Sequence, residues 1–214
     1  MDTEKQIDLI IDMRQAIPMG ELVVLTGGNG KGKSLIRKQM PYTVKDAFPD
    51  EVTDSKLPRV CKSVSMQLRT ESQPEFGALS QLAHDCPWNP TSTETYHLIK
   101  QLFKCIEDDE KFYFIIDEPE IGMSRESQLG IAQVILDKYL ANKDKIYGLL
   151  LITHSETIVN AVKDIAIFKN LDGIETADDW LNREIVPTDF EILTQESNDL
   201  FSAIQDRSNK KKKD

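Results

Sequence analysis

One short segment combines glycines, a lysine and a hydroxyl group in an order suited to binding phosphate. Residues 27–34 read GGNGKGKS and directly follow an apolar, strand-like stretch, 21–26. Glycines let the backbone turn tightly and direct successive N–H groups at phosphate oxygens. A helix beginning near Lys33 would add its positive N-terminal end. This spacing predicts that Lys33 reaches the β- and γ-phosphates of a nucleotide and that Ser34 binds Mg²⁺.

Two carboxylates follow a second apolar run. Phe112–Ile116 leads directly into Asp117 and Glu118. An aspartate at the end of a hydrophobic strand can hold Mg²⁺, and a neighbouring glutamate can orient and deprotonate an attacking water. An acidic turn after a buried strand would have the same sequence, but the phosphate-binding pattern upstream favours chemistry. We therefore expect Asp117 to be a metal ligand and Glu118 to be the general base.

A histidine follows a third apolar run. Leu149–Ile152 leads into Thr153, His154 and Ser155. A lone histidine in such a place is more often a structural hydrogen-bonding group than a catalytic one. Here, however, ligands of a parallel sheet bind beyond the carboxyl ends of its strands, where all three polar clusters are expected. We therefore expect His154 to contact the γ-phosphate.

The elements that must position these residues are strands alternating with helices. The three apolar runs are typical of strands buried on both faces of a mostly parallel sheet. Helical spacing is seen in two sets of apolar residues between them: Leu98, Ile99, Leu102, Phe103 and Ile106, and, more loosely, Leu129, Ile131, Val134, Ile135 and Leu140. The alternation predicts an α/β sandwich with right-handed crossovers.

Length and composition indicate one soluble domain. The chain has 214 residues, no internal repeat and no Gly/Ser-rich linker. We expect the domain to cover 1–207, and the lysine-rich segment 208–214 to be a disordered basic tail. A tail that binds nucleic acid or a partner is the alternative. The net charge of −10 argues against a broad surface for duplex DNA.

Cysteine usage and hydropathy indicate a cytoplasmic protein. The three cysteines form no C-x-x-C pair, which suits a reducing compartment. His84 and Cys86 lie close together, but no second pair completes a zinc site. No stretch approaches the roughly 20 apolar residues needed to span a bilayer, and the N-terminus is not a signal peptide. We expect no direct insertion into a membrane.

The three motifs together resemble those of the ATP-binding-cassette (ABC) ATPases. The segment 20–34 (GELVVLTGGNGKGKS) resembles their phosphate-binding loop, and 114–128 (FIIDEPEIGMSRESQ) resembles their second motif. The segment 149–159 (LLLITHSETIV) resembles their switch-histidine segment. Residues 164–168 and 171–173 resemble the strand and turn that follow. The order and spacing match from Met19 to about Gly173, most of the chain.

The resemblance implies ATP and Mg²⁺ as cofactors and assigns the residues that bind them. The nucleotide-binding set is Gly27, Gly28, Asn29, Gly30, Lys31, Gly32, Lys33 and Ser34. Glu118 falls at the position of the catalytic glutamate. The D-E-P-E-x-G and T-H-S wording is closer to the chromosome-maintenance, repair and defence branch (SMC-like, RecF-like, OLD-like) than to transporter subunits. That branch implies a homodimer closing head to tail around two ATPs, with a separate effector protein and, in some members, nucleic acid.

The chain departs from the family pattern in three places and leaves one further position with two candidates. Ser92 is the one candidate for the signature serine that contacts the partner's γ-phosphate, but no glycine follows it, and Thr91 and Glu94 also suit a helix N-terminus. Gln67 falls where the Mg²⁺- and water-binding glutamine is expected, with Gln73 as a competitor. No aromatic residue precedes the loop to stack on adenine, so GTP stays an alternative. The short segment between Gln67 and Leu98 implies a reduced helical subdomain.

Several functions compete on the sequence alone. The leading hypothesis is an ATPase that works as an ATP-gated dimer and drives or regulates a partner protein or a nucleic-acid process. The alternative is the ATP-energising subunit of a membrane transporter, against which the degenerate signature and the missing aromatic residue argue. A non-hydrolysing, nucleotide-gated binding module is disfavoured by Glu118. A small-molecule kinase would need an arginine-rich lid that the sequence does not contain.

Overall fold

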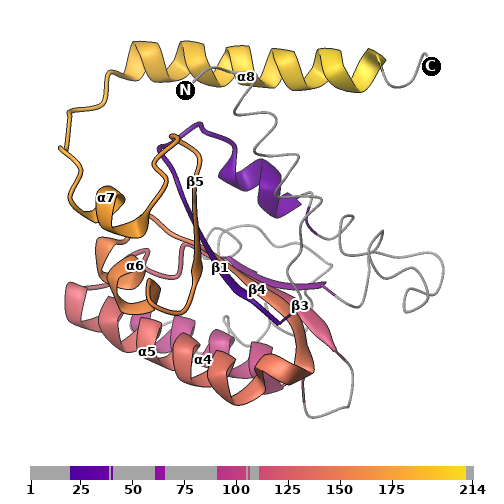
Figure 1. The fold of residues 1–214 in the computed structure, drawn as a ribbon, viewed down its shortest axis with the longest axis vertical. Helices are drawn as coiled ribbons and strands as arrows, with labels where there is room; N and C mark the ends of the chain where they lie inside the picture. Colours follow the sequence, from indigo (N-terminus) through magenta and orange to yellow (C-terminus); the bar gives the residue numbers. More distant parts are fainter. Residues whose placement is uncertain are drawn as a thin grey trace.

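A parallel sheet forms the centre of the molecule. The computed structural model describes residues 20–38, 40, 61–65, 91–104, 106 and 111–210, with the backbone alone for 204, 205 and 207–210. Within those residues the strands are β1 (Leu22–Thr26), β2 (Cys61–Ser65), β3 (Phe112–Asp117), β4 (Ile146–Ile152) and β5 (Ile167–Asn170). Their order in the sheet is β2-β3-β4-β1-β5, and each neighbouring pair is parallel (Figure 1).

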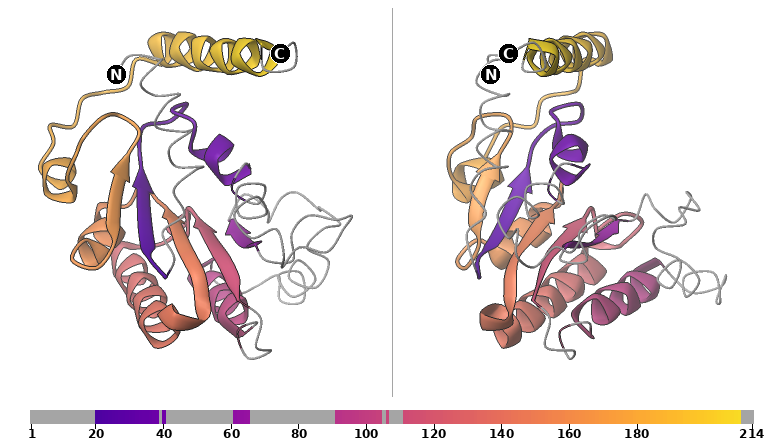
Figure 2. Two further views of the ribbon diagram at one scale, coloured as in Figure 1. Left: turned by 45° about the vertical axis from the view of Figure 1, so that its right-hand side comes forward. Right: turned by 90° about the vertical axis from the view of Figure 1, so that its right-hand side faces the viewer.

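Helices cover the sheet on both sides. They are a helix over 33–38, α4 (Thr91–Lys104), α5 (Arg125–Asn142), the 3₁₀ turn η5 (Lys143–Lys145), α6 (Glu156–Val162), α7 (Ala177–Leu181) and α8 (Phe190–Lys210). Helices α4 to α7 pack on one face, and the helix over 33–38 packs on the other (Figure 2). Helix α8 lies apart from the α4–α6 layer, on the side of the phosphate-binding segment. The predicted fold, a P-loop NTPase-like α/β sandwich, is confirmed.

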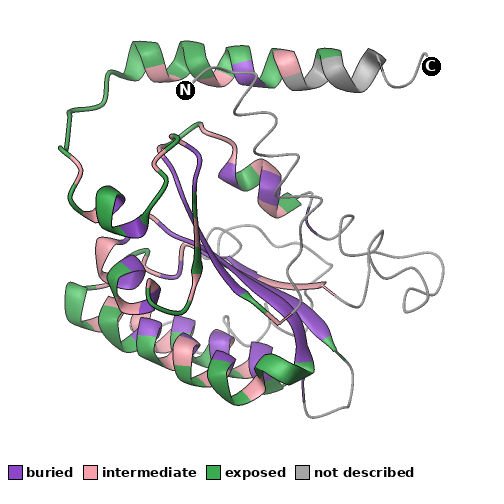
Figure 3. Ribbon diagram, in the orientation of Figure 1, coloured by how far each residue is buried: buried purple, intermediate pink, exposed green. Residues whose placement is uncertain are grey.

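Alternating side chains of the central strands fill two hydrophobic cores. In β1, Leu22 and Val24 join the core under α4, α5 and α6, whereas Val23 and Leu25 join the core that includes Ile36. Both faces of the central strands are therefore buried, as the interior strands in Figure 3 show. Burial on both faces explains why β1, β3 and β4 are apolar without alternation. Strand β5 lies at the sheet edge, and it does alternate between exposed and less exposed residues.

Two strands begin at other residues than the sequence predicts. Strand β4 starts at Ile146, three residues before the predicted run Leu149–Ile152. The predicted run is too short because Gly148 interrupts the hydrophobic pattern, although Gly148 belongs to the strand and pairs with Tyr113. Strand β5 starts at Ile167 rather than Asp164. The backbone N–H groups of Ile165 and Ala166 instead donate to Val162 and close a turn after α6.

Helices form at both places where the apolar spacing predicts them, but particular residues differ. In α5, Leu129 and Leu140 were expected to face the core and are exposed; Ala132 and Tyr139 are buried instead. Helix α8 continues to Lys210, so residues 208–210 of the predicted tail have helical backbone. In the described part of the chain, no helix has the length and apolarity to cross a bilayer.

Candidate functional site

The predicted phosphate-binding segment forms a tight turn between β1 and the helix over 33–38. The N–H groups of Leu35 and Ile36 both donate to the carbonyl oxygen of Gly32, at 3.0 Å each, and start that helix. Glycine is required at Gly27, because a Cβ there would lie 2.9 Å from the Cβ of Leu171 and the φ angle is 149°. The loop is therefore held against the turn that follows β5.

Lys33 lies inside this loop. Only 7% of the residue is exposed. Its Nζ donates to the carbonyl oxygens of Gly27 at 2.7 Å and Gly28 at 2.9 Å. Burial lowers the pKa of Lys33, and the carboxylates of Glu118, Asp172, Asp117 and Glu120 oppose that shift. Four acidic groups are thus close enough to act on one lysine.

Asp172 occupies part of the phosphate-binding loop. The N–H of Gly28 donates to Asp172 Oδ2 at 2.7 Å. Asn170 positions this carboxylate: its side-chain oxygen accepts from the N–H groups of Asp172 (2.8 Å) and Ile174 (3.1 Å), and its Nδ2 donates to Thr26. The sequence identified residues 171–173 as a turn but assigned Asp172 no contact. The order of the strands places this turn beside the loop, because β5 pairs with β1.

Helix α8 also contacts the loop. Lys31 Nζ and Glu196 Oε2 form an ion pair at 2.5 Å. A Cβ on Gly30, whose φ angle is 74°, would lie 2.1 Å from Ser197 Oγ. Leu200 is buried in the same core as Ile36. Sequence reasoning gave α8 no role at the site, and no pattern in residues 190–210 points to one.

Asp117 ends β3 in the predicted place, but it is already paired. Its Oδ2 accepts from Ser65 Oγ at 3.0 Å and lies 3.3 Å from Arg37 Nε. Burial raises the pKa of Asp117, and the Arg37 guanidinium and the Ser65 hydroxyl partly offset that rise. Both contacts use Oδ2, so Oδ1 takes part in neither. Arg37 lies four residues after Lys33 in the same helix, so both side chains share one helix face. That spacing is the sequence signal that could have identified Arg37 as a residue of the site.

Glu118 and His154 meet across the ends of β3 and β4. His154 Nε2 lies 3.3 Å from Glu118 Oε1, with 36% and 18% of the respective side chains exposed. The hydrogen bond from His154 is the main cause that lowers the pKa of Glu118. Glu118 has a φ angle of 49°, a left-handed conformation that is strained for residues other than glycine. Its N–H donates to Ile152 at 2.8 Å, so the backbone of β4 holds this conformation.

Glu120 positions the turn that carries His154. Its Oε1 accepts from the backbone N–H of His154 at 2.7 Å. Its other oxygen, Oε2, is buried and makes no hydrogen bond within the described residues. Burial raises the pKa of Glu120. Ser155 completes the turn, because its Oγ accepts from Ile158 N–H and caps α6.

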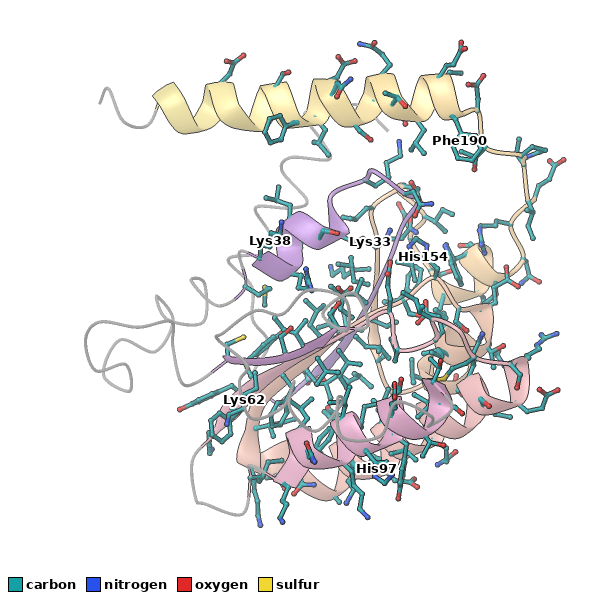
Figure 4. All side chains as sticks on the ribbon, turned by 180° about the vertical axis from the view of Figure 1, so that it is seen from behind. Lys33, Lys38, Lys62, His97, His154 and Phe190 are labelled. Carbon is teal, nitrogen blue, oxygen red and sulfur yellow. The ribbon has the colours of Figure 1, made fainter. Side chains whose placement is uncertain are left out.

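The structure therefore brings most of the predicted residues to one edge. Strand register sets Asp117 opposite Ile152, and Ile152 opposite Leu25. The polar clusters that follow these three residues therefore start at the same height along the strand direction. Figure 4 shows Lys33 and His154 on this side of the sheet, from different elements. Ser34 is exposed in the first turn of its helix.

Of the remaining predicted residues, Ser92 lies on another element and Gln67 is not described. Ser92 lies in the first turn of α4, whose first residue, Thr91, would touch a Cβ on Gly122 at 3.1 Å; this places α4 beside the turn after Glu118. Gln67, and its competitor Gln73, lie outside the described residues. Their predicted roles are untested.

The donor set fits Mg²⁺ bound together with a nucleotide. In the described part of the chain, no group of three or more His, Cys, Asp or Glu side chains could hold a metal by itself. Mg²⁺ commonly uses one or two protein oxygens with substrate phosphates and waters. The Ser34 hydroxyl and Asp117 Oδ1 offer two such oxygens, and the orphaned Glu120 Oε2 offers a buried acceptor for a water nearby.

Comparison with known proteins does not assign this chain to a family. No protein-family model and no curated protein matches the chain. A solved structure of PCH-2 from C. elegans is similar over 79% of this chain and 40% of its own, with a TM-score of 0.39 and 16% identity. This chain therefore spans less than half of that protein's length. A likeness of this extent assigns neither a family nor an activity.

Proposed function

We propose that the chain binds ATP with Mg²⁺ at the carboxyl edge of its sheet and hydrolyses it, as an ABC-type ATPase whose two copies close around nucleotide. The observation that carries this proposal is the contact between Glu118 and His154 beside the buried Lys33. A general base needs an ionised carboxylate, and Glu118, whose pKa is lowered chiefly by the hydrogen bond from His154, is ionised at neutral pH.

Phosphate binding would exchange the partners of the loop. Lys33 would turn from the carbonyl oxygens of Gly27 and Gly28 to the β- and γ-phosphates, a change of partner within reach of one side chain. Ser34 and Asp117 would hold Mg²⁺, which neutralises charge on the phosphate oxygens. The loop N–H groups would then donate to phosphate in place of carboxylate.

Hydrolysis would use Glu118 as the base. Glu118 takes a proton from a water as that water's oxygen bonds to the γ-phosphorus and the bond to the β–γ bridging oxygen breaks, which leaves ADP and phosphate. His154 orients the Glu118 carboxylate and faces the γ-phosphate. Glu120 holds the turn on which His154 sits. Gln67 would complete the metal and water shell.

Nucleotide binding would also change what covers the loop. The carboxylates of Asp172 and Glu196 lie on the loop and repel phosphate, so both contacts weaken when ATP arrives. Loosening of α8 then gives the molecule an output that a partner protein could read. In the closed dimer, Ser92 at the start of α4 would face the γ-phosphate bound by the other copy.

Trapping the closed state tests this proposal. Glu118→Gln should run as a dimer in Mg-ATP and as a smaller species without nucleotide, by size-exclusion chromatography with light scattering. Adding Ser92→Arg should prevent the dimer and spare ATP binding, whereas Asn160→Arg, at an exposed position on α6, should not. A Glu118→Gln protein that binds ATP and stays monomeric at high concentration contradicts the dimer. Phosphate release from the wild type separates an ATPase from a non-hydrolysing binding module.

A further inference from the structure

A cavity near the amino ends of the strands, opposite the candidate nucleotide site, is lined by basic side chains. It has a volume of about 420 Å³ and lies between the C-terminal parts of α4 and α5 and the turn η5. Its basic residues are His97, Lys100, Lys104, Lys138 and Lys145. Because η5 leads directly into the first residue of β4, the cavity lies at the amino ends of the strands. Strand β4 has seven residues, which separates the cavity from His154 by roughly 20 Å.

Two helix faces build the cavity. His97, Lys100 and Lys104 follow one another at spacings of three and four residues, so they share one face of α4. Lys138 and Asn142 share a face of α5, and Phe103 and Ile106 are buried at the base. In Figure 4, His97 lies at the far end of the molecule from Lys33 and His154. The cavity is therefore distinct from the candidate nucleotide site.

Carboxylates do not neutralise the cavity lysines within the described residues: none of the four forms an ion pair of the kind that Lys31 and Lys163 form elsewhere. Lys100 lies 5.6 Å from the ring centre of Tyr96. Gathering like charges costs free energy, about 0.2–0.5 kcal/mol for a pair four residues apart on a helix. That cost is incurred in a chain whose net charge is −10.

Helix dipoles account for part of this arrangement only. Lys104 and Lys145 lie at the C-terminal ends of α4 and of the turn after α5, where cations are favourable. That effect falls off within the last turn of a helix. Lys100 and Lys138 each lie four residues before the last residue of their helix. Their charges need another explanation.

We propose that this cavity binds a small anion that carries two or more phosphoryl groups. Lysine ammonium groups act as compact point charges suited to phosphate, and they are the main cationic groups among the described residues that line the cavity. Like charges in a concave site focus the field and concentrate anions. The volume falls in the range of small-ligand sites and is too small for a duplex.

The test uses inorganic tripolyphosphate as the probe, measured by isothermal titration calorimetry. All proteins carry Lys33→Ala, so that the phosphate-binding loop does not contribute. Lys100→Gln with Lys138→Gln removes two charges from the cavity. The matched control, Lys163→Gln with Lys169→Gln, removes one charge at the C-cap of α6 and one on β5. The dissociation constant should rise at least about tenfold in the cavity variant, and less than about twofold in the control.

Further arms identify the source of the phosphate. ADP represents a free nucleotide, and a short 5′-phosphorylated oligonucleotide, compared with its unphosphorylated form, represents a nucleic-acid end. Tighter binding of either by the intact cavity than by the cavity variant supports the proposal and names the source. Unliganded melting temperatures verify that both variants fold.

Two results overturn the proposal. One is equal affinity for tripolyphosphate in the cavity variant and the control. The other is no binding of tripolyphosphate by the protein that carries Lys33→Ala alone. Neither result bears on the phosphate-binding loop, since that loop is disabled in every protein compared.

Discussion

Replacing Glu118 by glutamine should remove activity with little effect on folding. The backbone of Glu118 is held by its N–H bond to Ile152, which glutamine retains. The substitution weakens only the contact at 3.3 Å with the partly exposed His154. Exposed pairs of this kind contribute less than about 1 kcal/mol. For a chain of this length the melting temperature should fall by no more than about 2–4 °C.

The effect on catalysis should be much larger. Glutamine has the shape of glutamate but cannot take a proton from water, so hydrolysis should slow by about 10²–10⁴-fold. That factor corresponds to about 2.7–5.5 kcal/mol in the activation barrier. The affinity for ATP should change little, because the proposed contacts to phosphate come from the loop and Lys33.

Phosphate release, measured beside a melting curve with and without Mg-ATP, separates the two effects. Glu126→Gln is the matched control, because Glu126 is exposed in the first turn of α5. It should leave hydrolysis unchanged. Glu118→Gln protein that hydrolyses ATP at the wild-type rate refutes Glu118 as the base. A fall in melting temperature well beyond 4 °C would show instead that the carboxylate supports the strained turn.

The other predictions concern the loop, the metal and pH. Lys33→Ala should abolish the rise in melting temperature that ATP causes, which corresponds to a stabilisation of about 2.7 kcal/mol at an ATP concentration of 100 times the dissociation constant. A retained rise contradicts the loop assignment. Asp117→Asn should weaken Mg²⁺-dependent binding and turnover together, and wild-type turnover at limiting Mg²⁺ would move that role elsewhere. Asp172→Asn should tighten ATP binding about fivefold, because a neutral acceptor on Gly28 competes less well with phosphate; weaker binding would mean that Asp172 organises the loop. The lowered pKa of Glu118 stabilises the fold above the ordinary value of 4.5, and this contribution is lost as pH falls through the lower native pKa. In urea unfolding, the stability difference between wild type and Glu118→Gln should therefore vanish on acidification; a constant difference contradicts the pairing with His154.

Local sequence was sufficient to predict the fold class and the sheet edge to which the candidate residues converge. Strands β1, β3 and β4 are buried on both faces, and uninterrupted apolar runs report that burial directly. Each run ends in polar residues, and parallel strands bring those ends to one edge. Lys33, Asp117, Glu118 and His154 therefore converge as the motif spacing predicts.

Only the tertiary structure decided what these residues contact. Gly28 and Asp172 are 144 residues apart in the chain, and Lys31 and Glu196 are 165 apart. Such pairs depend on β5 joining the edge beside β1 and on α8 crossing the loop, and no local periodicity encodes either arrangement. The burial of Lys33 and the left-handed backbone of Glu118 likewise follow from the surroundings, since neither residue type favours them. The basic cavity arises in the same way, because its lysines come from α4, α5 and the turn η5, and packing brings α4 beside α5 although β3 separates them in the sequence.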